Sequence, residues 1–238
     1  MTPKPTLNIA LPVYNEELEL AGSVSTLVHF LAKHLDDFDW RVTIADNAST
    51  DRTLQIGHDL AAADERVRVV HLSEKGRGRA VKRVWTEAHA DVVAYMDIDL
   101  STDLQHLPPL VRALQNGYDV ALGSRNLPAS QVANRSLTRT ITSKGYIFLI
   151  RAMFPVKFSD AQCGFKAVTR RVVDALIPQV VDNEWFFDTE LLILADQAGL
   201  RIFEEPVKWT DNPGSTVRVW KTAKADLEGL WRLRRLKR

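Results

Sequence analysis

The sequence lacks several features that mark other classes of protein. Cys163 is the single cysteine among 238 residues, which excludes a disulfide framework within the chain and fits a reducing cytosol. The net charge is only +1, whereas a general nucleic-acid binder carries a strongly basic face, so we expect no nucleic-acid partner. No run reaches the roughly 18 apolar residues that a membrane-spanning helix needs, and residues 1–6 are polar. We therefore expect neither a transmembrane segment nor a signal peptide.

Linkers, internal repeats and low-complexity stretches are missing as well. Hydrophobic residues make up 45% of the chain, which is enough to bury one substantial core. We predict one catalytic domain over residues 1–216, followed by a basic, amphipathic helix over residues 217–238. We expect the Cys163 thiol to be buried rather than nucleophilic.

Short apolar runs alternate with amphipathic helical patterns over the first hundred residues. Strands are predicted over residues 7–13, 41–45, 67–72 and 92–96. The helical patterns after the first three strands cover residues 20–35, 53–63 and 80–85, and Asn15 is the expected N-cap of the first. This alternation predicts an α/β fold with a mostly parallel sheet flanked by helices, whose ligands bind at the carboxyl ends of the strands.

The last of these strands ends in Asp97-Ile98-Asp99, with two carboxylates two residues apart. Carboxylates this close repel each other unless a cation lies between them. Mg²⁺ typically takes one or two carboxylates together with phosphate oxygens and water. The pair alone would fit a solvated acidic turn equally well, but two other predicted strands also lead into polar groups, Asp46 and Lys75-Gly76. We therefore predict a Mg²⁺ or Mn²⁺ site that binds a diphosphate.

Three segments resemble the inverting family 2 glycosyltransferases with the Rossmann-like GT-A fold. They are Leu11-Pro12-Val13-Tyr14-Asn15-Glu16, Asp46-Asn47-Ala48-Ser49-Thr50-Asp51 and Asp97-Ile98-Asp99. Later segments resemble the dolichyl-phosphate glucosyltransferase branch of the polyprenyl-phosphate sugar synthases. They are Gly123-Ser124-Arg125, Arg135-Ser136-Leu137-Thr138-Arg139, Asp160-Ala161-Gln162-Cys163-Gly164-Phe165-Lys166, residues 185–192 and Val207-Lys208-Trp209-Thr210.

The resemblance implies a donor site for a nucleoside diphosphate sugar, with UDP-sugar favoured over GDP-mannose. Asp99 is the expected direct metal ligand, and Asp97 is expected to contact the ribose or to reach the metal through water. Ser101 stands where the mannosyl branch has a glutamine ligand, which leaves the third protein ligand open. The other expected donor-binding residues are Pro12, Tyr14, Glu16, Asp46, Lys75, Gly76, Ile98, Arg218 and Lys221.

The resemblance also implies a polyprenyl phosphate acceptor. A phosphate is already ionised at pH 7, so the acceptor needs cationic positioning rather than a general base. Arg125, Arg135 and Arg139 are the expected cations, with Gln162 beside them, and Arg125 and Arg135 are counted with Asp99 as catalytic. Asp188 and Glu190 are expected to orient the sugar or to pair with the arginines, and Asp160 is expected to orient the sugar.

Two segments suggest contact with a membrane. Residues 227–238 combine Leu227, Leu230 and Trp231 with five basic residues among the last seven. This pattern favours a helix lying on an anionic membrane surface, and a solvated, frayed terminus fits it as well. The apolar residues 146–155 fit either the core or a helix that dips into the membrane. We expect a peripheral enzyme on the cytoplasmic face, with a separate membrane-protein partner left open.

The prediction is an inverting, metal-dependent transferase that moves a hexose or N-acetylhexosamine from a UDP-sugar to a polyprenyl phosphate. One alternative is a family 2 enzyme with a sugar or protein hydroxyl as acceptor. A second is a sugar-1-phosphate nucleotidyltransferase, which the missing glycine-rich loop after the first strand disfavours. A third is a non-catalytic, membrane-associated subunit that binds nucleotide sugars, which the intact Asp97 and Asp99 disfavour. No motif identifies the sugar or the length of the polyprenol.

Overall fold

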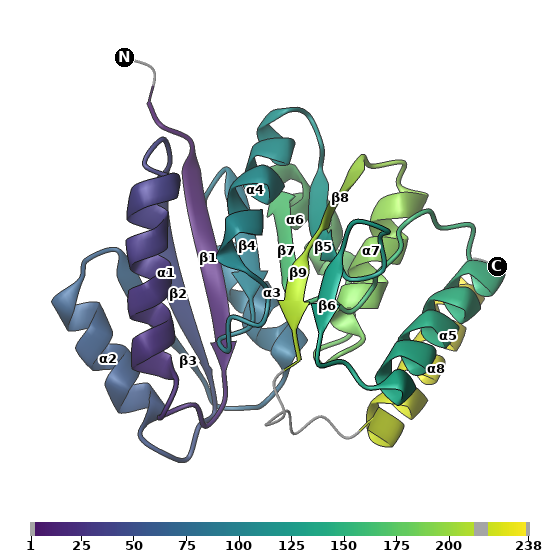
Figure 1. Ribbon diagram of the computed structural model, residues 1–238, viewed down its shortest axis with the longest axis horizontal. Helices are drawn as coiled ribbons and strands as arrows, with labels where there is room; N and C mark the ends of the chain where they lie inside the picture. The colour runs from purple at the N-terminus through teal and green to yellow at the C-terminus, as the bar shows by residue number, and fades with distance from the viewer. Residues whose placement is uncertain (1–2, 212–218, 237–238) are drawn as a thin grey trace.

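The computed structural model describes the backbone of residues 3–211 and 219–236, and the side chains of residues 3–211 and 223–235. Within this part of the chain a seven-stranded sheet runs through the centre, in the order β3-β2-β1-β4-β7-β5-β8 (Figure 1). The strands are β1 (Thr6–Val13), β2 (Asp39–Asn47), β3 (Val67–Leu72), β4 (Val92–Met96), β5 (Val120–Ser124), β7 (Phe165–Thr169) and β8 (Ile202–Pro206). The predicted α/β fold with a mostly parallel sheet is confirmed.

Helices cover both faces of the sheet, because apolar side chains alternate along each strand. Leu7, Ile9 and Leu11 of β1 belong to one buried cluster, while Ala10 belongs to the other. The first face is covered by α1 (Leu20–His34), α2 (Thr53–Ala63) and α4 (Leu107–Gln115). The second face is covered by α3 (Arg77–Glu87), α5 (Leu137–Met153), α6 (Arg170–Leu176), α7 (Phe187–Gln197) and α8 (Val219–Leu236).

Strand β7 is the one member of this sheet that runs antiparallel to both of its neighbours, β4 and β5. Its first residue, Phe165, is the register partner of Met96, the last residue of β4. The segment before β7 therefore reaches the edge at which the parallel strands end. A second, two-stranded sheet of β6 (Gln131–Ala133) and β9 (Lys208–Thr210) lies near the same region.

One local prediction about the first helix is wrong. Asn15 does not cap α1, which begins at Leu20. Instead Asn15 has a positive φ of 55°, a conformation that asparagine tolerates, and its side-chain oxygen accepts a hydrogen bond of 2.8 Å from the backbone of Thr50. This contact joins the loop after β1 to the loop after β2.

The C-terminal helix α8 packs beside α5 and α7 (Figure 1). Leu230 and Leu233 are buried against the core, whereas Leu227 and Trp231 are exposed. The predicted domain boundary between residues 216 and 217 lies outside the described residues and stays a prediction. No helix in the described part of the chain is long and apolar enough to cross a membrane.

Candidate active site

Polar residues from four strand ends meet at one edge of the sheet. Val13, Asp46 and His71 are register partners at the ends of β1, β2 and β3. Asp97 directly follows β4, which pairs with the other side of β1. The edge that the sequence predicted for ligand binding therefore brings together the loops that carry most of the expected donor-binding residues.

Asp97 lies at the centre of this edge. Its side chain is partly exposed, and an Oδ atom lies 2.7 Å from the guanidinium of Arg77. Gly164, just before β7, covers Asp97 so closely that a Cβ atom at position 164 would overlap the carboxylate. Burial raises the pKa of Asp97, Arg77 opposes that shift, and the Asp99 and Asp188 charges add to it.

Asp99 is held by the turn that follows β4. Both of its carboxylate oxygens accept hydrogen bonds from Ser101, one from the backbone at 3.0 Å and one from the hydroxyl at 2.5 Å. Ser101 therefore orients the carboxylate of Asp99. Ile98 is buried in the core beneath this turn, so the structure does not support a side-chain contact between Ile98 and the donor.

Negative charge collects around the turn. Burial and the carboxylates of Glu19, Asp99, Asp51 and Asp97 raise the pKa of Glu16 to about 7. Neither Glu16 nor Asp99 forms an ion pair with a basic residue in the part of the chain that the structure describes. These carboxylate oxygens, with their negative charge, suit a hard divalent cation that completes its coordination shell with phosphate oxygens and water.

The described residues contain no preformed cage of three or more His, Cys, Asp or Glu side chains. Mg²⁺ does not need one, because it is usually held by one or two carboxylates plus substrate phosphates. Asp99 and Asp97 are the residues that would hold the ion. Their roles as metal ligands stay predictions.

The other end of the edge is centred on Asp46. Its side chain is fully buried, and Oδ2 lies 2.7 Å from Nδ1 of His71. Above it, the ammonium group of Lys75 lies 3.6 Å from the centre of the Tyr14 ring. The hydrogen bond from Lys75 lowers the pKa of the Tyr14 hydroxyl. Pro12 lies half-buried in β1 opposite Ala45.

Gly76 packs against the protein's own backbone, whereas the sequence predicts that it contacts a phosphate. A Cβ atom there would overlap the carbonyl oxygen of Asn183. The backbone N–H groups of Gly78 and Arg79 donate to the carbonyls of Glu184 and Asn183 at 3.2 and 2.9 Å. The start of α3 thus binds the chain's own backbone through Gly78 and Arg79, and the role of Gly76 in donor binding stays a prediction.

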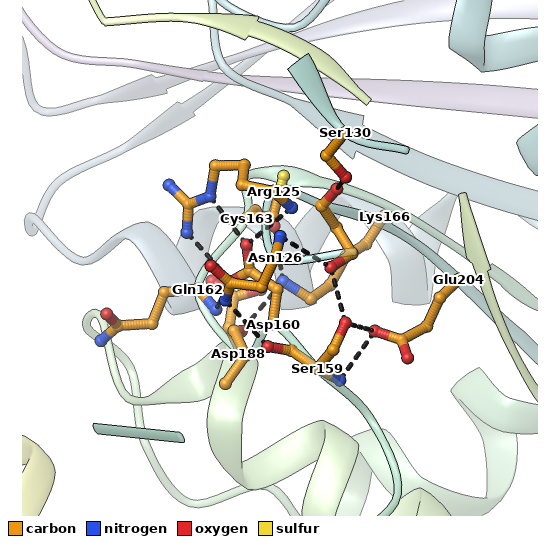
Figure 2. Close-up of polar contacts among 12 residues, drawn as sticks. Arg125, Asn126, Ser130, Ser159, Asp160, Gln162, Cys163, Lys166, Asp188 and Glu204 are labelled. Carbon is orange, nitrogen blue, oxygen red and sulfur yellow. Dashed lines mark hydrogen bonds and ion pairs between the residues drawn. The ribbon is translucent and has the colours of Figure 1, made fainter. Parts of the chain in front are cut away.

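Arg125 and Asp160 form a buried ion pair where β5 and the segment before β7 meet (Figure 2). Asp160 accepts from the Arg125 backbone at 3.1 Å and from two guanidinium nitrogens at 2.7 and 3.0 Å. Burial alone would raise the pKa of Asp160, but the pair with Arg125 lowers it to about 2. Asp160 therefore fixes the position of Arg125, and the structure does not support the sugar-orienting role predicted for it.

The other two predicted acceptor arginines lie near Arg125. Burial lowers the pKa of Arg135, and the positive charges of Arg125 and Arg139 lower it further. Arg139 pairs with Asp211. Arg125, Arg135 and Arg139 thus lie close enough to interact electrostatically, with Arg125 and Arg139 each paired with a carboxylate, and we call the three residues the arginine cluster. Its role in acceptor binding stays a prediction.

Asp188 lies in the first turn of α7 and is almost completely buried. It pairs with the ammonium group of Lys166 at 2.9 Å and accepts a hydrogen bond from the Tyr95 hydroxyl. Lys166 is itself fully buried and also donates to the carbonyls of Ala161 and Cys163 at 3.1 and 2.6 Å (Figure 2). Asp188 is therefore tied into the core below the Asp97 turn rather than free to bind a sugar.

Glu190 and Gln162 both bind helix α8. Both oxygens of the buried Glu190 lie 3.0 Å from a guanidinium nitrogen of Arg232. The side-chain amide of Gln162 donates to Asp226 at 2.8 Å. The predicted sugar-orienting role of Glu190 is not supported, and Gln162 has a partner inside the fold. The predicted donor ligand Arg218 and the side chain of Lys221 lie outside the described residues.

Four residues of this region had no role predicted from the sequence: Arg77, Tyr95, Lys166 and His71. Tyr95 and Asp97, at the end of β4, are two residues apart, so their side chains point to the same face of the sheet, toward α3. There the guanidinium of Arg77 lies 5.3 Å from the centre of the Tyr95 ring. This two-residue spacing was a signal from which the contact with Arg77 could have been predicted. Lys166 and His71 gave none, because each contacts a partner that is more than 20 positions away. Cys163 is buried as predicted, and burial raises the pKa of its thiol to about 11.

The sheet with its reversed strand and the acidic turn after β4 define the GT-A architecture of nucleotide-sugar transferases. The family model for glycosyl transferase family 2 matches residues 8–177, and the chain belongs to that family.

Similarity to individual proteins narrows the assignment to one branch of the family. Dolichyl-phosphate beta-glucosyltransferase of Drosophila melanogaster is 30% identical over 246 residues, covering 97% of this chain and 76% of the relative. Glycosyltransferase AglD of Haloferax volcanii is 40% identical over 205 residues, covering 85% of this chain. The chain spans only 33% of the length of AglD. These similarities place the chain in the dolichyl-phosphate glycosyltransferase branch.

Solved structures support the fold. Glucosyl-3-phosphoglycerate synthase of Mycobacterium tuberculosis in complex with Mn²⁺, UDP-glucose and phosphoglyceric acid superposes with a TM-score of 0.71 at 18% identity. The match covers 97% of this chain and 79% of that one. The UDP complex of the same enzyme gives a TM-score of 0.69 at 21% identity. At this identity the likeness extends to the fold alone.

Proposed function

We propose that the protein is an inverting, metal-dependent glycosyltransferase that moves a hexose from a nucleoside diphosphate sugar, with UDP-sugar favoured, to a polyprenyl phosphate. The names of the relatives support the lipid acceptor, because the enzymes of Drosophila and of man that align over most of this chain are called dolichyl-phosphate beta-glucosyltransferases. The manganese and UDP-glucose in the related synthase structure support the donor and the metal.

The observation that carries the proposal is that the carboxylates predicted to orient the sugar are each paired with a basic residue. Asp160 is paired with Arg125, Asp188 with Lys166 and Glu190 with Arg232. A carboxylate whose oxygens are bound to a buried cation is badly placed to take a proton from an acceptor hydroxyl, so it makes a poor general base. A hydroxyl acceptor needs a base, whereas an ionised phosphate needs only positioning by cations. The arrangement therefore favours phosphate as the nucleophile.

The donor end has the opposite character. Asp97 and Asp99 would hold a divalent ion, which when bound stabilises the negative charge that develops on the departing diphosphate. Ser101 orients Asp99, and Arg77 orients Asp97. Asp46 and Tyr14 line the end of the edge at which we expect the base. The turn after β4 would thus bind the diphosphate between the base and the arginine cluster.

Exposed apolar side chains on α5 and α8 support a membrane-facing surface. Leu137, Ile141 and Phe148 on α5 are 82%, 69% and 75% exposed. Leu227 and Trp231 on the neighbouring α8 are 44% and 58% exposed. Basic residues accompany them on the same two helices: Lys144, Arg151, Lys224, Arg234 and Arg235. Apolar residues among basic ones are typical of helices that lie on anionic lipid. Because α5 starts two residues after Arg135, this surface would present the lipid phosphate to the arginine cluster.

The test is a donor and acceptor screen. The protein, with Mn²⁺, is mixed with radiolabelled UDP-glucose, UDP-N-acetylglucosamine or GDP-mannose, and with either a polyprenyl phosphate or a free sugar. We expect label to enter the organic phase only with polyprenyl phosphate and only with a metal present. Label transferred to the free sugar instead would favour the hydroxyl-acceptor alternative. The Asp99→Asn variant serves as the control for contaminating transferases.

A further inference from the structure

The buried carboxylate of Asp46 has one oxygen bound and one without a partner. Oδ2 lies 2.7 Å from Nδ1 of His71, on the neighbouring strand β3. Because an ionised carboxylate only accepts hydrogen bonds, Nδ1 is the nitrogen that carries the proton. Oδ1 is buried and has no hydrogen-bond partner among the described residues. A buried acceptor without a donor is unfavourable, so Oδ1 is a binding position for an incoming N–H group.

The location of Oδ1 points to a planar ligand. Tyr14 follows β1 and Lys75 follows β3, so their contact spans the end of β2, where Asp46 lies. A planar base that enters here would replace Lys75 and stack its ring against Tyr14. The edge of the base would then face Asp46. Asn47 does not compete for that edge, because neighbouring residues of a strand project to opposite faces.

The number of free oxygens distinguishes the bases. Uracil has one ring N–H, flanked by two carbonyl acceptors, so a single carboxylate oxygen satisfies it. Guanine has a ring N–H and an adjacent amino group, and a carboxylate recognises them by offering one oxygen to each. In this structure the second oxygen is held by His71.

We propose that His71 makes the donor site selective for uracil over guanine nucleotides, by holding Oδ2 of Asp46 and leaving Oδ1 as the single acceptor for the base. This inference rests on the proposed function, since it takes the donor to be a nucleotide sugar bound at this edge. His71 is a positioning residue that acts through Asp46.

The experiment measures binding of UDP, GDP and IDP by calorimetry in the presence of Mn²⁺. IDP is the informative third ligand, because its base keeps the size and the ring N–H of guanine but lacks the amino group. The variants are His71→Ala, which frees Oδ2, and His71→Asn, whose side-chain amide keeps an N–H near the position of Nδ1. His29→Ala, at an exposed position of α1, is the matched control. Thermal unfolding of each variant verifies that it is folded.

We expect the parent protein to bind UDP at least about tenfold more tightly than GDP, since a buried group left unpaired costs about this factor. In His71→Ala the second oxygen becomes available, so GDP should gain about tenfold relative to IDP, and the UDP preference should fall. His71→Asn should keep most of the preference, and His29→Ala should keep all of it.

Three results would overturn the assignment to His71: a parent protein that prefers GDP, a preference unchanged in His71→Ala, or equal gains for GDP and IDP, which would mean a merely loosened site. If the preference is unchanged while label still passes from UDP-sugar to polyprenyl phosphate, the proposed function stands and His71 alone is refuted. A parent protein that binds none of the three nucleotides would refute the donor site, and the proposed function with it.

Discussion

The two sides of the active-site edge manage charge in opposite ways. On the side formed by β1, β2 and β4, the carboxylates of Glu16 and Asp99 have no basic partner among the described residues. On the side formed by β5, β7 and α7, Asp160, Asp188 and Glu190 each have one, and each pair is largely buried. On the first side Arg77 pairs with Asp97 alone among the carboxylates that the structure describes, whereas on the second side each of the three carboxylates holds a cation in place.

This difference explains how similar residues serve different purposes. Unpaired carboxylates repel one another, and a cation between them relieves the repulsion, so their side of the edge is receptive to a metal ion. Paired carboxylates contribute rigidity, because breaking a buried pair leaves a charge without compensation. A motif carboxylate that lacks a basic partner is therefore the stronger candidate for a metal ligand. The predictions below alter one side at a time.

The largest effect is expected from breaking the buried ion pair of Lys166 and Asp188 on the second side. Replacing Lys166 by Met leaves Asp188 buried with the Tyr95 hydroxyl as its one remaining partner in the described part of the chain, and should lower the free energy of unfolding by about 3–5 kcal/mol. Urea denaturation measures the loss. The double variant Lys166→Met/Asp188→Leu removes both charges and should recover most of it. A single variant as stable as the parent would contradict the pairing.

The unpaired side should respond in activity rather than in stability. Asp99→Asn should reduce transfer by about 100-fold or more, because it removes a ligand of the ion that stabilises the leaving diphosphate. Manganese binding in the presence of UDP should weaken in parallel, while the thermal midpoint changes little. Asp103→Asn, four residues away and able to keep its cap on Gln105, is the control. Turnover of Asp99→Asn within a few-fold of the parent would remove Asp99 from the site.

Asp226, on the neighbouring α8, is an exception, since its buried carboxylate meets only the amide of Gln162 among the described residues. Burial, together with the Asp182 and Asp188 charges, raises its pKa to about 7. Since the unfolded chain releases this proton at the ordinary pKa of 3.8, stability should fall as the pH rises from about 4 through 7. Asp226→Asn keeps the bond to Gln162 without the charge, and should add about 2 kcal/mol at pH 8.

The gain from Asp226→Asn should shrink toward pH 5, where the native Asp226 keeps its proton. Thermal or urea unfolding at the two pH values provides the comparison. An equal gain at both would mean that the carboxylate is ionised in the folded protein throughout this range.

The arginine cluster should affect the acceptor alone. Arg135→Ala should raise the KM for polyprenyl phosphate about tenfold, as expected for the loss of one charge-assisted contact, and leave UDP binding unchanged. Arg135→Lys should recover part of the loss, because lysine cannot reproduce the planar fork of arginine. Arg171→Ala, at an exposed arginine on α6, is the control. Loss of UDP affinity in Arg135→Ala would place Arg135 at the diphosphate instead.

The smallest effect is expected at the membrane-facing surface. The double variant Leu227→Ser/Trp231→Ser should weaken binding to anionic liposomes about fivefold, and binding of the parent should fall as salt increases. Leu18→Ser, at a leucine that is 90% exposed before α1, is the control. Deleting the whole helix would be a poor test, because it would also leave Glu190 without Arg232. Equal liposome binding by all three proteins would exclude this surface.

The first four strands and the first three helices could be predicted from the sequence because their signals are local. Helix α2 has the predicted bounds, Thr53–Ala63, and β3 and β4 match their apolar runs. Asn15 was misassigned because an asparagine before a helical pattern can cap it or adopt a positive φ, and the choice depends on Thr50, which lies 35 positions further on.

The sequence predicted which loops meet at this edge of the sheet, but not the partners that the carboxylates have there. Motif resemblance brought Asp160, Asp188 and Glu190 to the right region, but each carboxylate took a partner from a distant segment: Arg125, Lys166 and Arg232. Sequence spacing carries no information on such pairs, since they depend on how β7 and α8 pack. The direction of β7 has no local signal either, because its five residues would suit a parallel strand equally well.

Strand β7 also constrains the order in which the molecule can form. It lies between β4 and β5, yet it follows both in the chain. During synthesis, the edge of β4 therefore stays unpaired until Phe165–Thr169 emerges, some 70 residues after the Asp97 turn is made. The donor and acceptor sides become neighbours in that single late insertion. A ribosome-bound fragment that ends before β7 should expose an open strand edge and be the species most prone to aggregate or to need a chaperone.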